Sequence, residues 1–176
     1  MKKTKRIRVP ILIKLMAFSC LLVIVITSSI GFLVLNVQKK QFKDQLINFG
    51  ESLLHIMAKN APDKLLAEED MALFKLVKDI SGNEQIVRVS IASQSNIIVA
   101  HSDLDQVNKK YVPPKGLTRI KTTDQGIELS TFKTDGNEFL FLKIPLAYQG
   151  IQIGHGQIVI SQKIIEKNIS QSKRYI

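Results

Sequence analysis

The sequence is poor in cysteine, histidine and aromatic residues, and each shortage removes a class of function. Cys20 is the only cysteine, so no intrachain disulfide can form. The three histidines, His55, His101 and His155, do not have the spacing of a metal-ligand motif, and we expect no metal and no cofactor. Aromatic residues make up 6% of the chain, tryptophan is absent, and no basic run is interleaved with aromatics, which argues against nucleic-acid binding.

The net charge of +10 is concentrated at the N-terminus. Six of the 25 bases and no acid lie in residues 1–14, which leaves 19 bases and 15 acids, well interspersed, for the rest of the chain. A basic, acid-free leader of this kind is typical of the cytoplasmic side of a membrane span. We therefore interpret residues 1–14 as a cytoplasmic leader.

Residues 15–37 form an uncharged apolar run of 23 residues. As a helix the run would measure roughly 34 Å, enough to cross a bilayer core of about 30 Å. A cleaved signal peptide is the alternative, but its apolar region is usually about 7 to 15 residues long and ends in small residues. We expect a single retained transmembrane helix in the cytoplasmic membrane, with the N-terminus in the cytoplasm and the chain from Gln38 onward in the periplasm or outside the cell.

Two helices are predicted after the span. Residues 38–59 carry an apolar stripe at helical spacing, which can cover a sheet, pair with a second copy, or do both; its members are Phe42, Leu46, Phe49, Leu53, Ile56 and Met57. Pro62 and Asp63 are expected to break this helix. A second helix should cover residues 65–80, with an apolar face of Leu66, Met71, Phe74, Val77 and Ile80.

The period of the apolar residues then changes to two, which predicts strands. Asp135-Gly136 is a strong hairpin signal between two of them. The expected fold is α+β, with a five-stranded antiparallel sheet inside a domain of residues 38–162 and an exit helix over residues 163–176. The five predicted strands are residues 86–92, 97–102, 127–133, 138–145 and 152–161.

Two stretches carry a resemblance to a known family: IVRVSIASQSNIIVAHSD (residues 86–103) and FLKIPLAYQGIQIGHGQIVIS (residues 141–161). In their order and spacing they resemble the extracytoplasmic PAS-like sensor domains, or single Cache domains, of bacterial transmembrane signalling receptors. The resemblance covers roughly residues 38–173 and implies a five-stranded PAS-like sheet with a histidine near the end of its second strand. Relatives often have glycine a few residues after that histidine, where this chain has Asn108. Asparagine also tolerates the left-handed conformation.

His101, Ser102 and Asp103 are consecutive, which excludes a catalytic triad built from them. On a strand their side chains alternate between the two faces and cannot converge on one reaction centre. No catalytic residue is expected in this segment. His101 either borders a ligand pocket or hydrogen-bonds the following loop, and Ser102 and Asp103 are expected to bind nearby backbone amides.

A ligand site is predicted on the polar face of the sheet. Arg88 and Ser90 share one face of their strand, and Phe139, Phe141 and Lys143 share one face of theirs. Packing of the Lys143 stem over a solvated sheet is the alternative for that residue. If the two strands are neighbours, the site favours a small anion and consists of Arg88, Ser90, His101, Phe141 and Lys143.

The predicted function is ligand sensing for a homodimeric membrane receptor of the histidine kinase, nucleotide or diguanylate cyclase, or chemoreceptor type. In this interpretation a small molecule binds outside the cell membrane and the membrane helices carry the signal inward. The alternative is a binding or assembly module anchored by a single span, without signalling. An anchored enzyme is a distant third.

Overall fold

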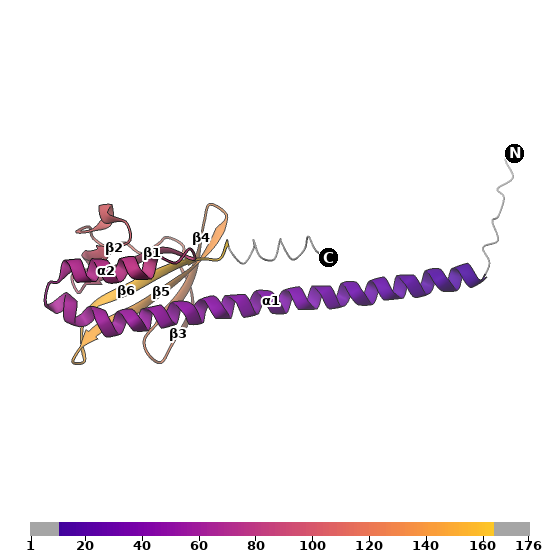
Figure 1. Cartoon of the computed structure of the whole chain (residues 1–176), viewed down its shortest axis with the longest axis horizontal. Coiled ribbons are helices and arrows are strands. Elements are labelled where there is room, and N and C mark those ends of the chain that lie inside the picture. The colour runs from indigo at the N-terminus through magenta and orange to yellow at the C-terminus, as the bar shows by residue number, and fades with distance from the viewer. Residues whose placement is uncertain (1–10, 164–176) are drawn as a thin grey trace. The chain divides into compact units, whose positions relative to one another are not determined.

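The computed structural model describes residues 11–163, which divide into two compact units at residues 41 and 42. Helix α1 (Ile11–Leu66) runs from the first unit into the second (Figure 1). Its stretch Ile13–Val34 has a mean hydropathy of 2.4 and is long and apolar enough to cross a membrane. The predicted exit helix lies outside the described residues apart from Lys163, and so do residues 1–10 of the predicted leader.

The second unit contains one antiparallel sheet of six strands in the order β2-β1-β6-β5-β4-β3. The α+β class is confirmed, but the expected number of five strands is wrong because β3 was not predicted. Every residue of β3 is exposed and only Ile120 among them is apolar, so its sequence shows no alternation. The strands are β1 (Ile86–Ser93), β2 (Ile98–His101), β3 (Thr118–Thr122), β4 (Glu128–Thr134), β5 (Asn137–Tyr148) and β6 (Ile151–Ser161).

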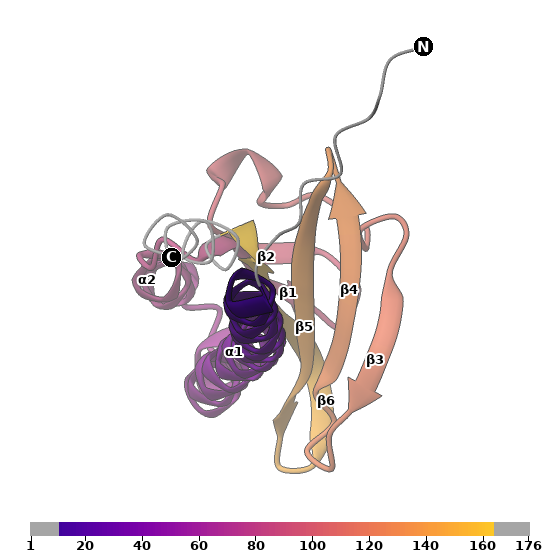
Figure 2. The same ribbon diagram turned by 90° about the vertical axis from the view of Figure 1, so that its right-hand side faces the viewer.

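Two helices cover one face of the sheet. Helix α2 (Asp70–Ser81) and the part of α1 that belongs to the second unit lie on the same side of the strands (Figure 2). Glycines allow α1 to approach closely: a Cβ atom on Gly156 of β6 would collide with Met57, and one on Gly50 of α1 would lie 2.8 Å from Cδ1 of Ile160. Among residues 11–163 no α-helix covers the opposite face, the helix-free face; only the loop after β2, with the short 3-10 helix η1 (Leu104–Gln106), lies on that side.

The helix boundaries differ from those predicted. Pro62 lies inside α1, which continues to Leu66, so the expected break at Pro62 is wrong. The chain turns only at Glu68, whose φ is 54°, and α2 begins at Asp70. Burial on the sheet therefore stabilises the last turns of α1 despite the missing proline amide, since Ala61 and Pro62 are both buried.

The predicted apolar faces are right in part. On α1, Leu46 and Met57 are buried as expected, whereas Ile56 is exposed. Leu66 and Met71 are also exposed, because the turn between the helices takes them off the face that contacts the sheet. The buried residues of α2 are Leu73, Val77 and Ile80.

The predicted Asp135-Gly136 turn is confirmed. Both residues have positive φ, 52° and 75°, as a two-residue turn with right-handed strand twist requires. Gln149 and Gly150 repeat this pattern between β5 and β6 with φ of 48° and 82°. The two hairpins keep β4, β5 and β6 in register, which places the side chains described next.

Candidate ligand-binding cavity

The helix-free face of the sheet carries side chains in aligned rows, because residues paired across antiparallel strands point to the same face. One row runs across five strands through His101, Ser90, Gln157, Lys143 and Glu128. The neighbouring row contains Arg88, Val159, Phe141 and Ser130. The polar residues of β1, β2 and β6 thus lie on a single surface.

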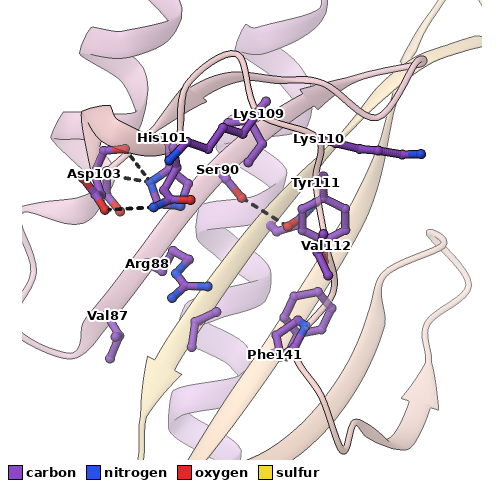
Figure 3. Close-up of a pocket in the computed structure, with 16 residues that line it drawn as sticks. Val87, Arg88, Ser90, His101, Asp103, Lys109, Lys110, Tyr111, Val112 and Phe141 are labelled. Atoms are coloured by element: carbon purple, nitrogen blue, oxygen red, sulfur yellow. Dashed lines mark hydrogen bonds between the residues drawn. The ribbon is translucent and has the colours of Figure 1, made fainter.

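A cavity of about 500 Å³ lies between this face and the loop that joins β2 to β3. Figure 3 shows Lys109, Lys110, Tyr111 and Val112 of the loop on the same side of the sheet as Arg88 and Ser90 of β1. The size is within the range of small-molecule sites in proteins, which is about 300 to 1,000 Å³. The main side chains contributed by the sheet are Arg88, Ser90, His101, Phe141 and Gln157.

Four of the five predicted site residues line this cavity, and Lys143 does not. Lys143 borders a separate hollow of about 310 Å³ together with Glu128 and Gln152. The prediction made its strand a neighbour of β1, whereas β6 lies between β1 and β5. That the other four residues bind a ligand remains a prediction.

Gln157 and Tyr111 belong to the cavity and were not predicted. The alternation of residues 152–161 places Gln157 and Val159 on one face of β6, so a signal for Gln157 was present. Whether Gln157 lies near Arg88 and Ser90 depends on the strand order, which places β6 next to β1. Tyr111 lies in an irregular loop, where periodicity carries no information.

His101 is almost fully buried, with 4% of its surface exposed. Its Nδ1 atom lies 2.8 Å from the backbone nitrogen of Asp103 and 2.9 Å from the carbonyl oxygen of the same residue. An unprotonated Nδ1 accepts from the amide, and a protonated Nδ1 donates to the carbonyl. The two predicted roles of His101 therefore coexist in its geometry, since the ring both borders the cavity and hydrogen-bonds the following loop.

Burial is the main influence on the charge of His101. It lowers the pKa of the ring below its ordinary value of 6.5, and the nearby charge of Arg88 lowers it too. The hydrogen bond to the backbone of Asp103 and the charge of that residue act in the opposite direction. The ring is thus held mainly neutral at pH 7, and an anion beside it would favour the charged form.

The loop is fixed to β1 and β2 by hydrogen bonds. The Ser102 hydroxyl accepts from the amide of Val89 at 3.2 Å, and the Asp103 carboxylate accepts from the amide of Asp105 at 3.1 Å, which confirms the predicted roles of both side chains. Asn108 has a φ of 65°, the left-handed conformation expected from the resemblance. Its amide donates to the carbonyl of Ile98 at 2.8 Å. The loop that covers the cavity is therefore held to β1 at Ser102 and to β2 at Asn108.

Tyr111 closes the cavity toward His155. Their ring centroids are 5.2 Å apart at an interplanar angle of 71°. Burial lowers the pKa of His155 to about 4, with a smaller lowering from the charge of Lys143. Burial also raises the pKa of Tyr111 to about 12, against a smaller opposite effect of Arg88. Both rings are therefore uncharged at neutral pH.

Most charged residues around the cavity are cationic. Arg88, Lys109 and Lys110 contribute three cations, and Asp103 is the one carboxylate among the lining residues. None of the three cations takes part in an ion pair among residues 11–163. Charge-assisted hydrogen bonds from such groups are the strongest polar contacts available to a carboxylate or phosphate.

No family model and no curated protein matches the sequence. The structure is similar to the E. coli DcuS sensor domain, with a TM-score of 0.57 and 11% identity over 72% of this chain and 96% of that one. It is also similar to the sensor domain of the V. cholerae histidine kinase DctB, with a TM-score of 0.50 and 13% identity over 76% of this chain and 58% of that one. This chain thus spans little more than half of the DctB domain. The PAS-like sensor-domain fold expected from the sequence is confirmed.

Proposed function

We propose that this chain is the extracytoplasmic sensing part of a membrane receptor and binds a small organic anion in the cavity beneath the β2–β3 loop. The fold is that of the DcuS and DctB sensor domains, and the candidate span precedes it in the chain. The basic leader supports an orientation with the N-terminus in the cytoplasm. DctB is a histidine kinase, which makes a kinase the first output to test.

The cavity itself carries the proposal. Arg88 and His101 border it from the sheet, and Lys109 and Lys110 border it from the loop. A carboxylate between Arg88, His101 and Lys109 would receive hydrogen bonds from both layers, whereas the Lys110 side chain points away from them (Figure 3). Binding would thereby tie the loop to the sheet and stabilise the closed arrangement of the two.

Signal transfer to α1 has a short route through β6. Gln157 borders the cavity, and the next residue toward the N-terminus, Gly156, lies against Met57 of α1. A small displacement of this part of β6 on ligand binding would change how α1 packs. A second link is the ion pair between Glu51 of α1 and Lys121 of β3, with 3.0 Å between Oε1 and Nζ. Coupling between such sites is typically about 1 to 3 kcal/mol.

We also propose that the receptor is a homodimer joined through α1. Leu46 of the predicted apolar stripe is not available for a dimer interface, because it is buried in the core. Phe42, Phe49 and Leu53 are only partly buried; Phe49 and Leu53 also pack against the core, and the exposed parts of the three side chains can contact a second copy. Two helices anchored in one membrane have a high effective concentration, so a weak interface is sufficient.

A thermal-shift screen of small organic acids, amino acids and amines tests the proposed site. The soluble segment that begins at Phe42 is suitable because it is a compact unit. An anion at 100 times its Kd should raise the melting temperature by on the order of 5 to 15 °C. Arg88→Ala should remove the response, and Lys143→Ala, a cation outside the cavity, is the matched control. If no anion raises the melting temperature of the wild type, or if the two variants show equal increases, the proposal is contradicted.

A further inference from the structure

Three polar atoms at the inner end of the cavity are buried without a hydrogen-bond partner among the described residues. They are the Tyr111 hydroxyl, Nε2 of His155 and Nε2 of Gln157. His155 and Gln157 are among the best buried polar side chains, with 4% and 3% of their surface exposed. Buried polar groups are nearly always hydrogen-bonded, so these three atoms call for a partner, either water or a polar group of a ligand.

The three side chains converge from two elements. His155 and Gln157 are two residues apart on β6 and therefore point to the same face of the sheet. Tyr111 reaches them from the loop, with its ring centroid 5.2 Å from that of His155. Tyr111 and Gln157 both line one end of the cavity, whereas His155 is not among its lining residues and lies next to it against the Tyr111 ring.

Arg88 lies toward the other end. It pairs with Val159, two residues along β6 from Gln157, which corresponds to about 7 Å at about 3.3 Å per residue. A ligand of about four carbons is therefore long enough to contact Arg88 with one end and Gln157 or Tyr111 with the other.

Tyr111, His155 and Gln157 themselves carry no charge at neutral pH. Oε1 of Gln157 accepts a hydrogen bond from the Ser90 hydroxyl, so Nε2 of the same amide remains as a donor. Burial keeps His155 neutral and Tyr111 protonated at neutral pH, since the pKa of the former is about 4 and that of the latter about 12. Lys143, whose charge reaches His155, lines the neighbouring hollow rather than this cavity.

We propose that Tyr111 and Gln157, with His155 packed against the Tyr111 ring, form a subsite for a neutral hydrogen-bonding group, a hydroxyl or a primary amide, at the far end of the bound anion. The inference rests on the proposed function, because Arg88 and His101 hold the anionic end. It specifies the ligand class as a short monocarboxylate with a distal hydroxyl or amide. A second carboxylate is disfavoured there, because the polar groups of the subsite are uncharged and Lys143, the cross-strand neighbour of Gln157, lines another hollow.

The test uses four-carbon acids that differ only at the distal end: butyrate, γ-hydroxybutyrate, succinamate and succinate. Isothermal titration calorimetry of the full chain in detergent micelles measures each Kd. γ-Hydroxybutyrate and succinamate should bind about 3- to 10-fold more tightly than butyrate, as one or two net hydrogen bonds would give. Succinate should bind more weakly than succinamate.

Tyr111→Phe removes one hydroxyl without changing the shape of the ring. It should reduce the preference for γ-hydroxybutyrate over butyrate by about 3-fold and leave the Kd of butyrate unchanged. Tyr148→Phe, at the exposed end of β5, is the matched control and should preserve the preference. Gln157→Met provides a second variant with similar shape, which should reduce the preference for succinamate.

The outcomes separate the inference from the proposed function. Equal binding of butyrate, γ-hydroxybutyrate and succinamate, with all three lost in Arg88→Ala, would keep the anion site and overturn the subsite, whose polar atoms would then bind only water. A preference for succinate also overturns it. If none of the four acids binds, or if Arg88→Ala binds them as the wild type does, the proposed anion site fails and the subsite with it.

Discussion

The Ser90 hydroxyl of β1 donates to Oε1 of Gln157 on β6 at 3.1 Å, and both side chains are buried. The two residues face each other directly across the strands. Their hydrogen bond satisfies the carbonyl end of the Gln157 amide and leaves the nitrogen for the cavity. A buried polar pair in this place contributes little to stability by itself, and its main effect is to orient a binding group.

Ser90→Ala leaves Oε1 of Gln157 without its donor, and we expect a loss of about 1 to 3 kcal/mol in the free energy of unfolding. Ser90→Thr keeps the hydroxyl and should recover most of this loss. The double variant Ser90→Ala/Gln157→Met should lose less unfolding free energy than the sum of the losses of the two single variants. The reason is that no unpaired carbonyl remains in the double variant. Urea denaturation of the soluble segment measures these values, and strict additivity would show that the two side chains do not interact.

Gly156→Ala should destabilise the fold by about 1 to 3 kcal/mol, since its Cβ would collide with Met57 of α1. Gly82→Ala is the matched control. Gly82 has a φ of −65°, and the nearest atom to a Cβ there is the carbonyl oxygen of Asp79 at 3.6 Å. Its substitution should change the melting temperature little. Equal effects of the two substitutions would contradict the close packing of α1 on β6.

Stability should fall as the pH decreases from about 6.5 to about 4. The folded state holds the pKa of His155 at about 4, below the ordinary value of 6.5. In this window the unfolded chain binds more protons than the folded one, so stability is complete above it and is lost on acidification. His155→Gln should flatten this dependence, whereas His55→Gln, on the exposed side of α1, should not. Chemical denaturation at a series of pH values measures the free energy of unfolding. If its dependence on pH is the same in His155→Gln as in the wild type, the prediction is wrong.

Phe49→Glu should abolish self-association of the soluble segment. Phe49 is partly buried on the stripe of α1 that remains beside the sheet contact, and a carboxylate there would be buried in a dimer interface. Ile151→Glu, an equally drastic change at the exposed β5–β6 hairpin, is the control. Sedimentation velocity should show a dimer only for wild type and control. A strict monomer in a membrane preparation of the wild-type chain would count against the interface.

Much of the fold was predictable because periodicity is a local property. The alternation in β1, β2, β4, β5 and β6 and the Asp135-Gly136 turn identified five of the six strands. The all-exposed β3 has no such signal. Pro62 was misleading, because local preference predicts a helix break where tertiary burial keeps α1 intact.

The site was less predictable because it depends on strand order. Arg88 and Ser90 were placed correctly relative to one another, since they lie on a single strand. Lys143 was assigned to the wrong hollow because the insertion of β6 between β1 and β5 is a long-range feature. The same feature brings in Gln157, and the loop brings in Tyr111. The alternation of β6 indicates the face on which Gln157 lies but not its neighbours, and no local pattern indicates Tyr111.

The most direct test of the anion site is an amide NMR titration of the soluble segment with the acid that stabilises it most. We predict the largest chemical-shift changes at Ser90, His101, Lys109 and Gln157, all of which line the cavity. Smaller changes should follow at Met57, which lies against Gly156. Changes confined to the hollow around Lys143, or no saturable change at all, would contradict a ligand site beneath the β2–β3 loop.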